Sequence, residues 1–128
     1  MDVPATAGDW TYRSAPGGGT ASFGEQQSEP RFTMRCDRAQ RVIYLERAGQ
    51  ATGQAAVTIR AETANRTLTS SPTAGAQPLV RASLPASDRL LDAMALSKGR
   101  FAVETAGLPT LYIPAWPEVT RVIEDCRS

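Results

Sequence analysis

Hydrophobic and polar residues alternate in a stretch near the first quarter of the chain, and a short polar break divides the stretch. Phe32, Met34 and Cys36 are spaced two residues apart, which is the period of a strand with one buried face. The following run, residues 42–45, is β-branched and aromatic, as strands prefer. Asp37 opens the break, and aspartate suits the first position of a type I turn. We therefore predict a β-hairpin with Cys36 on its core side.

Similar runs predict further short strands along most of the chain. Turn-forming residues separate them, and Asn65-Arg66 and residues 71–78 are predicted to be a turn and a loop. The predicted strands outside the hairpin cover residues 10–13, 20–23, 55–61, 67–70, 79–84, 101–104 and 111–113.

Two later segments have the period of a helix instead. In residues 87–96, Ser87 is the predicted N-cap, and Leu90 and Met94 are four residues apart on one apolar stripe. The second helix is predicted to begin at Pro117, since proline suits the first helical turn. Its apolar stripe comprises Val119, Val122, Ile123 and Cys126.

These elements predict an α+β, mostly β fold. About eight short strands form an antiparallel β-sandwich or barrel-like sheet, with two helices near the C-terminus. The length of 128 residues suits a single globular domain, placed at residues 9–128. Residues 1–8 are small and polar and are predicted to be a mobile leader.

The two cysteines both lie on predicted apolar faces. A Cys36–Cys126 disulfide would pin the last helix onto the hairpin, whereas two buried free thiols are the alternative. Two ligands alone cannot complete a zinc site, so no metal is expected. A disulfide would place the protein in an oxidising compartment.

Composition argues against several functions. The chain has no histidine, which removes the commonest general base and metal ligand. Its basic residues are thirteen arginines and Lys98, spread along the chain and matched by 13 acids, so no basic stripe for nucleic acid forms. No run approaches the roughly 18 apolar residues of a membrane span. We expect no enzyme activity, no catalytic residue and no cofactor.

A few polar and aromatic residues are candidates for a functional site. Asp88 and Asp92 are four apart on one helix face, but such carboxylates are usually solvated. Trp116 lies between Pro114 and Pro117, and a rigid aromatic loop of this kind can anchor a partner.

The segment Thr33-Met34-Arg35-Cys36-Asp37 resembles a strand of the membrane-bound and periplasmic lysozyme inhibitors. The layout, from Arg35-Cys36 to a final helix ending in Glu124-Asp125-Cys126, is similar to the small accessory lipoproteins of type VI secretion. Over nearly its whole length the chain resembles small exported alphaproteobacterial envelope proteins of unknown function, with Trp116-Pro117-Glu118 and Glu124-Asp125-Cys126-Arg127 as the segments that carry the resemblance.

These resemblances imply export to the periplasm or cell envelope. A signal peptide or lipobox is then expected before Asp2 in the unprocessed protein, with a possible lipid anchor. The expected function is a non-enzymatic envelope module, binding or structural, whose partner is a protein or cell-wall component. The alternative is a periplasmic inhibitor of a cell-wall hydrolase.

Overall fold

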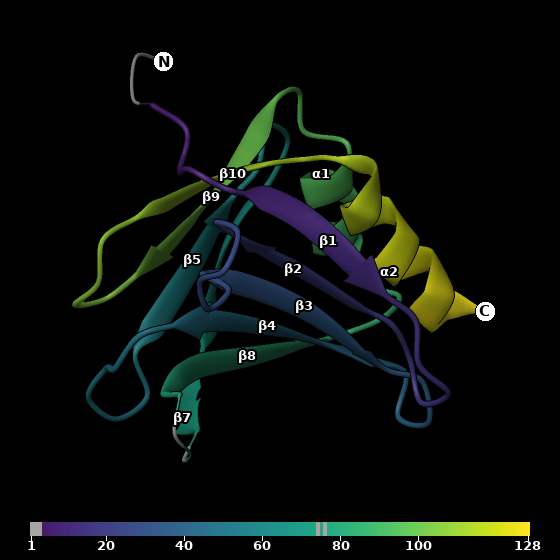
Figure 1. Ribbon diagram of the computed structural model, residues 1–128, viewed down its shortest axis with the longest axis horizontal. Coiled ribbons are helices and arrows are strands. Elements are labelled where there is room, and N and C mark those ends of the chain that lie inside the picture. Colours follow the sequence, from purple (N-terminus) through teal and green to yellow (C-terminus); the bar gives the residue numbers. More distant parts are fainter. Residues whose placement is uncertain (1–3, 74, 76) are drawn as a thin grey trace.

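The computed structural model describes residues 4–73, 75 and 77–128. Its described strands form two antiparallel sheets that face each other as a β-sandwich, and two helices lie together at one side of it (Figure 1). The expected mostly β, α+β fold is therefore confirmed, with ten strands in the described ranges where about eight were expected.

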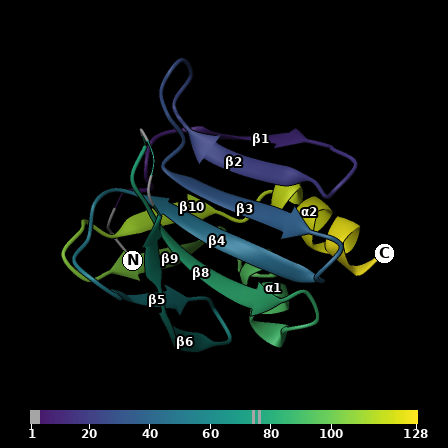
Figure 2. The same cartoon turned by 90° about the horizontal axis from the view of Figure 1, so that it is seen from below.

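The larger sheet contains six of the described strands, and Figure 2 views it from below. The predicted hairpin is its centre: Asp37 faces Val42, and the Asp37 carboxylate accepts a hydrogen bond from the Gln40 amide across the turn. In spatial order the strands are β1 (Asp9–Arg13), β2 (Thr20–Gly24), β3 (Phe32–Asp37), β4 (Val42–Ala48), β8 (Leu79–Pro85) and β7 (Ser71–Thr73).

The smaller sheet contains four of the strands in the described ranges. Its two inner strands, β9 and β5, come from distant parts of the chain, and Val103 faces Ile59 across them. In spatial order the strands are β10 (Leu111–Pro114), β9 (Arg100–Thr105), β5 (Ala56–Arg60) and β6 (Asn65–Thr69).

Apolar and polar residues alternate along most of the strands, and the apolar residues lie between the two sheets. Phe32 contacts Trp10 on one side and Phe101 of the other sheet on the other, both in edge-to-face geometry with ring centroids 6.3 and 6.1 Å away. The Trp10 indole N–H donates to the Pro114 carbonyl at 2.7 Å, so the polar edge of this buried ring is satisfied. The core thus ties the two sheets together.

The helices α1 (Arg89–Ala95) and α2 (Pro117–Arg127) pack against each other and close one side of the sandwich. All four residues of the predicted stripe of α2, Val119, Val122, Ile123 and Cys126, are buried. Cys126 forms a disulfide with Cys36 on β3, with a Cα–Cα distance of 5.5 Å across 90 residues of sequence. The predicted bridge is confirmed.

Among the described residues, no helix has the length and apolar character that crossing a bilayer requires.

Three sequence predictions were wrong in detail. Asn65-Arg66 is not a turn: both residues belong to β6, and the chain reverses at residues 61–64, where the Ala61 amide donates to the Ala64 carbonyl. The loop predicted at residues 71–78 begins as β7, whose Pro72 is tolerated because β7 is an edge strand. The N-cap of α1 is Asp88 rather than Ser87, since the Asp88 carboxylate accepts from the Leu90 amide at 2.8 Å.

Part of the predicted leader contacts the sheet. The Thr6 amide donates to the Tyr112 carbonyl at 2.9 Å, and the Thr6 hydroxyl accepts from the Tyr112 amide at 2.8 Å. Residues 1–3 lie outside the described residues. The described part of the predicted leader, residues 4–8, is therefore attached to β10 through Thr6.

Candidate functional site

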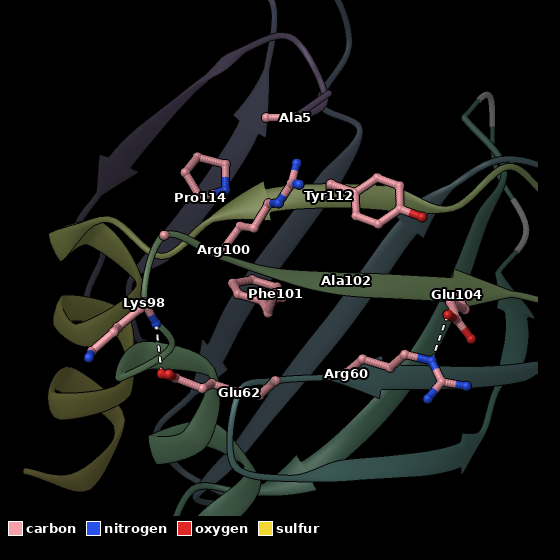
Figure 3. A pocket seen from close by; sticks show the side chains of 12 residues that line it. Ala5, Arg60, Glu62, Lys98, Arg100, Phe101, Ala102, Glu104, Tyr112 and Pro114 are labelled. Atoms are coloured by element: carbon pink, nitrogen blue, oxygen red, sulfur yellow. Dashed lines mark hydrogen bonds and ion pairs between the residues drawn. The ribbon is translucent and has the colours of Figure 1, made fainter. Parts of the chain in front are cut away.

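A hollow of about 750 Å³ lies on the outer face of the four-stranded sheet (Figure 3). We call it the Ala102 groove and define it by Arg60, Arg100, Ala102, Glu104 and Tyr112, which come from β5, β9 and β10. Its volume falls in the range of pockets that hold small ligands or short polymer segments.

The strand register explains the hollow. Tyr112, Ala102 and Arg60 occupy one row across three neighbouring strands, so the methyl group of Ala102 lies between two long side chains. Alternation along β9 adds Arg100 and Glu104 on the same face, two residues before and after the alanine. A short side chain surrounded by four long ones produces a depression with an apolar floor.

The walls carry both signs of charge. The Arg100 guanidinium lies 5.3 Å from the centre of the Tyr112 ring, a cation–π contact that orients both groups. On the opposite wall, Arg60 Nε donates to Glu104 Oε2 at 2.6 Å, and the two side chains are 52% and 37% exposed. An exposed pair of this kind adds little stability, so its groups can exchange partners with a ligand at small cost.

One end of the groove is fixed to helix α1. The Glu62 amide donates to the Ser97 hydroxyl at 3.0 Å, and that hydroxyl donates to the Ala93 carbonyl at 2.9 Å. The Glu62 carboxylate accepts from the Lys98 amide at 3.1 Å, whereas the Lys98 ammonium points away from the groove (Figure 3). The other end is bordered by Ala5, next to Thr6. The groove is thus held by the sheet, by α1 and by the N-terminal segment.

The residues singled out in the sequence lie elsewhere. Cys36 and Cys126 are buried in their disulfide between β3 and α2. Trp116 is 41% exposed and borders a separate shallow depression with Arg121 and Glu124.

Asp88 and Asp92 form separate ion pairs rather than a common site. Asp88 bonds Arg66 at 2.6 Å, and Asp92 bonds Arg127 at 2.8 Å. The hydrogen bond from Arg66 lowers the pKa of Asp88, and the one from Arg127 lowers the pKa of Asp92. Both carboxylates thereby connect α1 to other elements.

Sequence reasoning missed the Ala102 groove. The sequence feature that could have indicated the groove is the spacing of Arg100, Ala102 and Glu104 two residues apart along one strand, which places them on one face. Their neighbours Arg60 and Tyr112 follow only from the pairing of β9 with β5 and β10, which the sequence pattern leaves undetermined.

Within the described ranges, no three or more Asp, Glu, Cys or His residues are grouped so that they could hold a metal ion. No family model, curated protein or solved structure matches this chain.

Proposed function

We propose that this protein is a non-enzymatic binding module of the cell envelope that holds a peptide-bearing component of the cell wall in the Ala102 groove. The observation that carries the proposal is the groove itself, in which an apolar floor lies between walls of both charge signs. A wall peptide has apolar alanine-like side chains together with free carboxylate and amino groups. Such a ligand would match the floor and both kinds of wall.

The buried disulfide supports the envelope location. Cys36 and Cys126 are paired and buried, and stable disulfides of this kind are typical of proteins that fold in oxidising compartments. The envelope location also agrees with the resemblance of the sequence to exported proteins.

Binding would use the guanidinium groups of Arg60 and Arg100 for carboxylates and the carboxylate of Glu104 for an ammonium group. Arginine presents its donors as a planar fork that fits a carboxylate with two hydrogen bonds. The Tyr112 ring would cover the apolar part of the ligand. The ligand would be bound without being cleaved.

The test fills the groove without touching its charges. Ala102→Phe would occupy the floor, because Ala102 is buried between Tyr112 and Arg60 in its row and a ring at this position would take up the space above it. Thr67→Phe is the matched control, because Thr67 is exposed on the same face of the same sheet but outside the groove. The probe is soluble peptidoglycan fragments that carry intact stem peptides, titrated by calorimetry.

We expect the parent and Thr67→Phe to bind these fragments alike, and Ala102→Phe to bind about tenfold more weakly or worse. Fragments whose stem peptides have been removed should not bind. Equal binding by Ala102→Phe, or no binding by the parent, would refute the proposal.

The same proteins separate this function from the alternative, inhibition of a cell-wall hydrolase. The lysozyme inhibitors that the sequence resembles require a Ser-Gly-x-x-Tyr loop, and no Ser-Gly pair occurs in this chain. Inhibition of lysozyme by the parent protein at stoichiometric concentrations would favour the alternative.

A further inference from the structure

We infer that the outer face of the six-stranded sheet binds an anionic polysaccharide, independently of the Ala102 groove. The centre of this face is a cluster of Arg35, Tyr44, Glu46 and Arg81, which we call the arginine cluster. It comes from β3, β4 and β8, three neighbouring strands in Figure 2.

The unusual member of the cluster is Glu46. In the strand register Glu46 lies opposite Arg81 and Thr33, which are on the outer face, so Glu46 is on that face too. Its side chain is nevertheless only 1% exposed. A carboxylate can be buried at a sheet surface only when its neighbours cover and neutralise it. Arg35 bonds one of its oxygens at 2.6 Å, and Arg81 bonds the other at 2.6 Å.

Glu46 fixes the two guanidinium groups while leaving both accessible. The Arg35 and Arg81 side chains remain 47% and 37% exposed. Arg81 also lies over the Tyr44 ring, 4.8 Å from its centre. Each guanidinium has five N–H donors, so donors remain for a ligand after Glu46 is satisfied. Side chains held in this way lose little conformational entropy when they bind an anion.

The charge of the surrounding face is complementary to an anion. The row that contains Tyr44 also contains Arg35 and, two strands further, the exposed Arg13. In these central rows three arginines accompany one carboxylate, which is buried. The acids Asp9 and Asp37 lie in the rows beyond, and the Asp37 carboxylate accepts from the Gln40 amide in the turn.

Hydroxyl groups occupy most other positions of the two central rows. They belong to Thr11, Thr20, Ser22, Thr33, Ser71 and Ser83. Strands lie about 4.8 Å apart, so five strands give a strip roughly 20 Å wide. A strip that alternates fixed guanidinium groups with hydroxyls suits a chain of sugar hydroxyls interrupted by carboxylates or sulfate esters. A polysaccharide with such groups is therefore the occupant that the face favours.

The test uses charge-matched double variants. Arg13→Gln/Arg35→Gln removes two positive charges from the face, and the glutamine at position 35 can still donate to Glu46. Arg89→Gln/Arg121→Gln removes the same charge from exposed positions of α1 and α2, off this face and outside the Ala102 groove. Thermal melting of all three proteins checks that they are folded.

The probes are oligogalacturonate, a sulfated oligosaccharide of similar length and neutral dextran. We expect the parent and the control variant to bind at least one of the two anionic probes and not dextran, with affinity that falls as salt increases. Arg13→Gln/Arg35→Gln should bind about tenfold more weakly and show a flatter dependence on salt. The two anionic probes distinguish carboxylate from sulfate as the preferred group.

Three results would overturn the inference. One is equal weakening by the control variant, which would show that only net charge matters. Another is binding of dextran as tight as that of both anionic probes. The last is the absence of any anionic-oligosaccharide binding by the folded parent at low salt, including the case in which it binds anionic phospholipid vesicles instead. None of these results bears on Ala102→Phe, because the groove lies on the other sheet.

Discussion

Gly18 packs so closely against Cys36 that a Cβ atom on the glycine would lie 2.9 Å from the Cys36 sulfur. The contact places the turn at residues 16–19 directly on the disulfide, and the Cys36 amide donates to the Gly19 carbonyl at 2.9 Å beside it. Gly18 also has a φ of +136°, which side-chain-bearing residues rarely adopt. The position is therefore restricted to glycine for two independent reasons.

Gly18→Ala should lower the free energy of unfolding by about 1–3 kcal/mol, because the methyl group forces the turn away from β3 and strains the backbone. Gly17→Ala is the matched control, since a Cβ at Gly17 meets nothing within 4 Å. It should change stability by less than about 0.5 kcal/mol. Urea titration of the three proteins measures both effects. Equal stability of the two variants would contradict the packing described.

The disulfide should be a major contributor to stability. Cys36 and Cys126 are separated by 90 residues, and the loop-entropy relation gives a contribution on the order of 4 kcal/mol for closing such a loop. Cys36→Ala/Cys126→Ala should therefore unfold at a much lower urea concentration than the parent. The bridge itself is checked by mass: unfolded, unreduced protein should take up no alkylating agent, and reduced protein should take up two equivalents. Two alkylated cysteines without reduction would refute the bridge.

Helix α2 should depend on its buried stripe. Val122 is fully buried against the sandwich, so Val122→Asp places an unpaired carboxylate in the core. We expect this substitution to lower the free energy of unfolding by about 3 kcal/mol or more. Thr120→Asp, at an exposed position of the same helix, serves as the control and should leave the melting temperature within a few degrees of the parent value. If Val122→Asp melts together with this control, α2 does not pack as described.

The elements that could be predicted from the sequence are those whose burial depends on local periodicity. The stripe of α2 and the alternation of Phe32, Met34 and Cys36 follow from single-element geometry, and both are buried as expected. Because Cys36 and Cys126 each lie on such a face, their pairing could be predicted as well.

What could not be predicted depends on partners from distant segments. Glu46 and Arg47 are consecutive charged residues, yet both are buried. Glu46 is covered by Arg35 and Arg81, and Arg47 donates to the Pro109 carbonyl at 2.6 Å, 62 residues away. The same reason hid the Ala102 groove, whose walls meet only after β5, β9 and β10 pair.

Asp125 should make stability depend on acidic pH. Its carboxylate accepts from the Gly19 amide at 2.6 Å and from the Arg38 guanidinium at 2.7 Å, and so joins α2 to the turn that packs on the disulfide. The amide hydrogen bond from Gly19 is the main cause that lowers the pKa of Asp125, and Arg38 lowers it further, while partial burial acts in the opposite direction.

The sign of the effect follows from that direction. The pKa of Asp125 is lower in the folded protein than its ordinary value of 3.8, so the unfolded chain binds the proton first as pH falls. The stabilisation is therefore fully present above about pH 5 and is lost as pH falls through 3.8 towards the folded pKa.

Asp125→Asn should be less stable than the parent at pH 7, because an amide oxygen is a weaker acceptor for both donors. Between pH 5 and pH 3 it should lose less stability than the parent, which urea titrations at each pH measure. Asp9→Asn, at an exposed position on β1, is the control and should follow the parent curve. A parallel decline of Asp125→Asn and the parent would show that Asp125 does not carry this pH dependence.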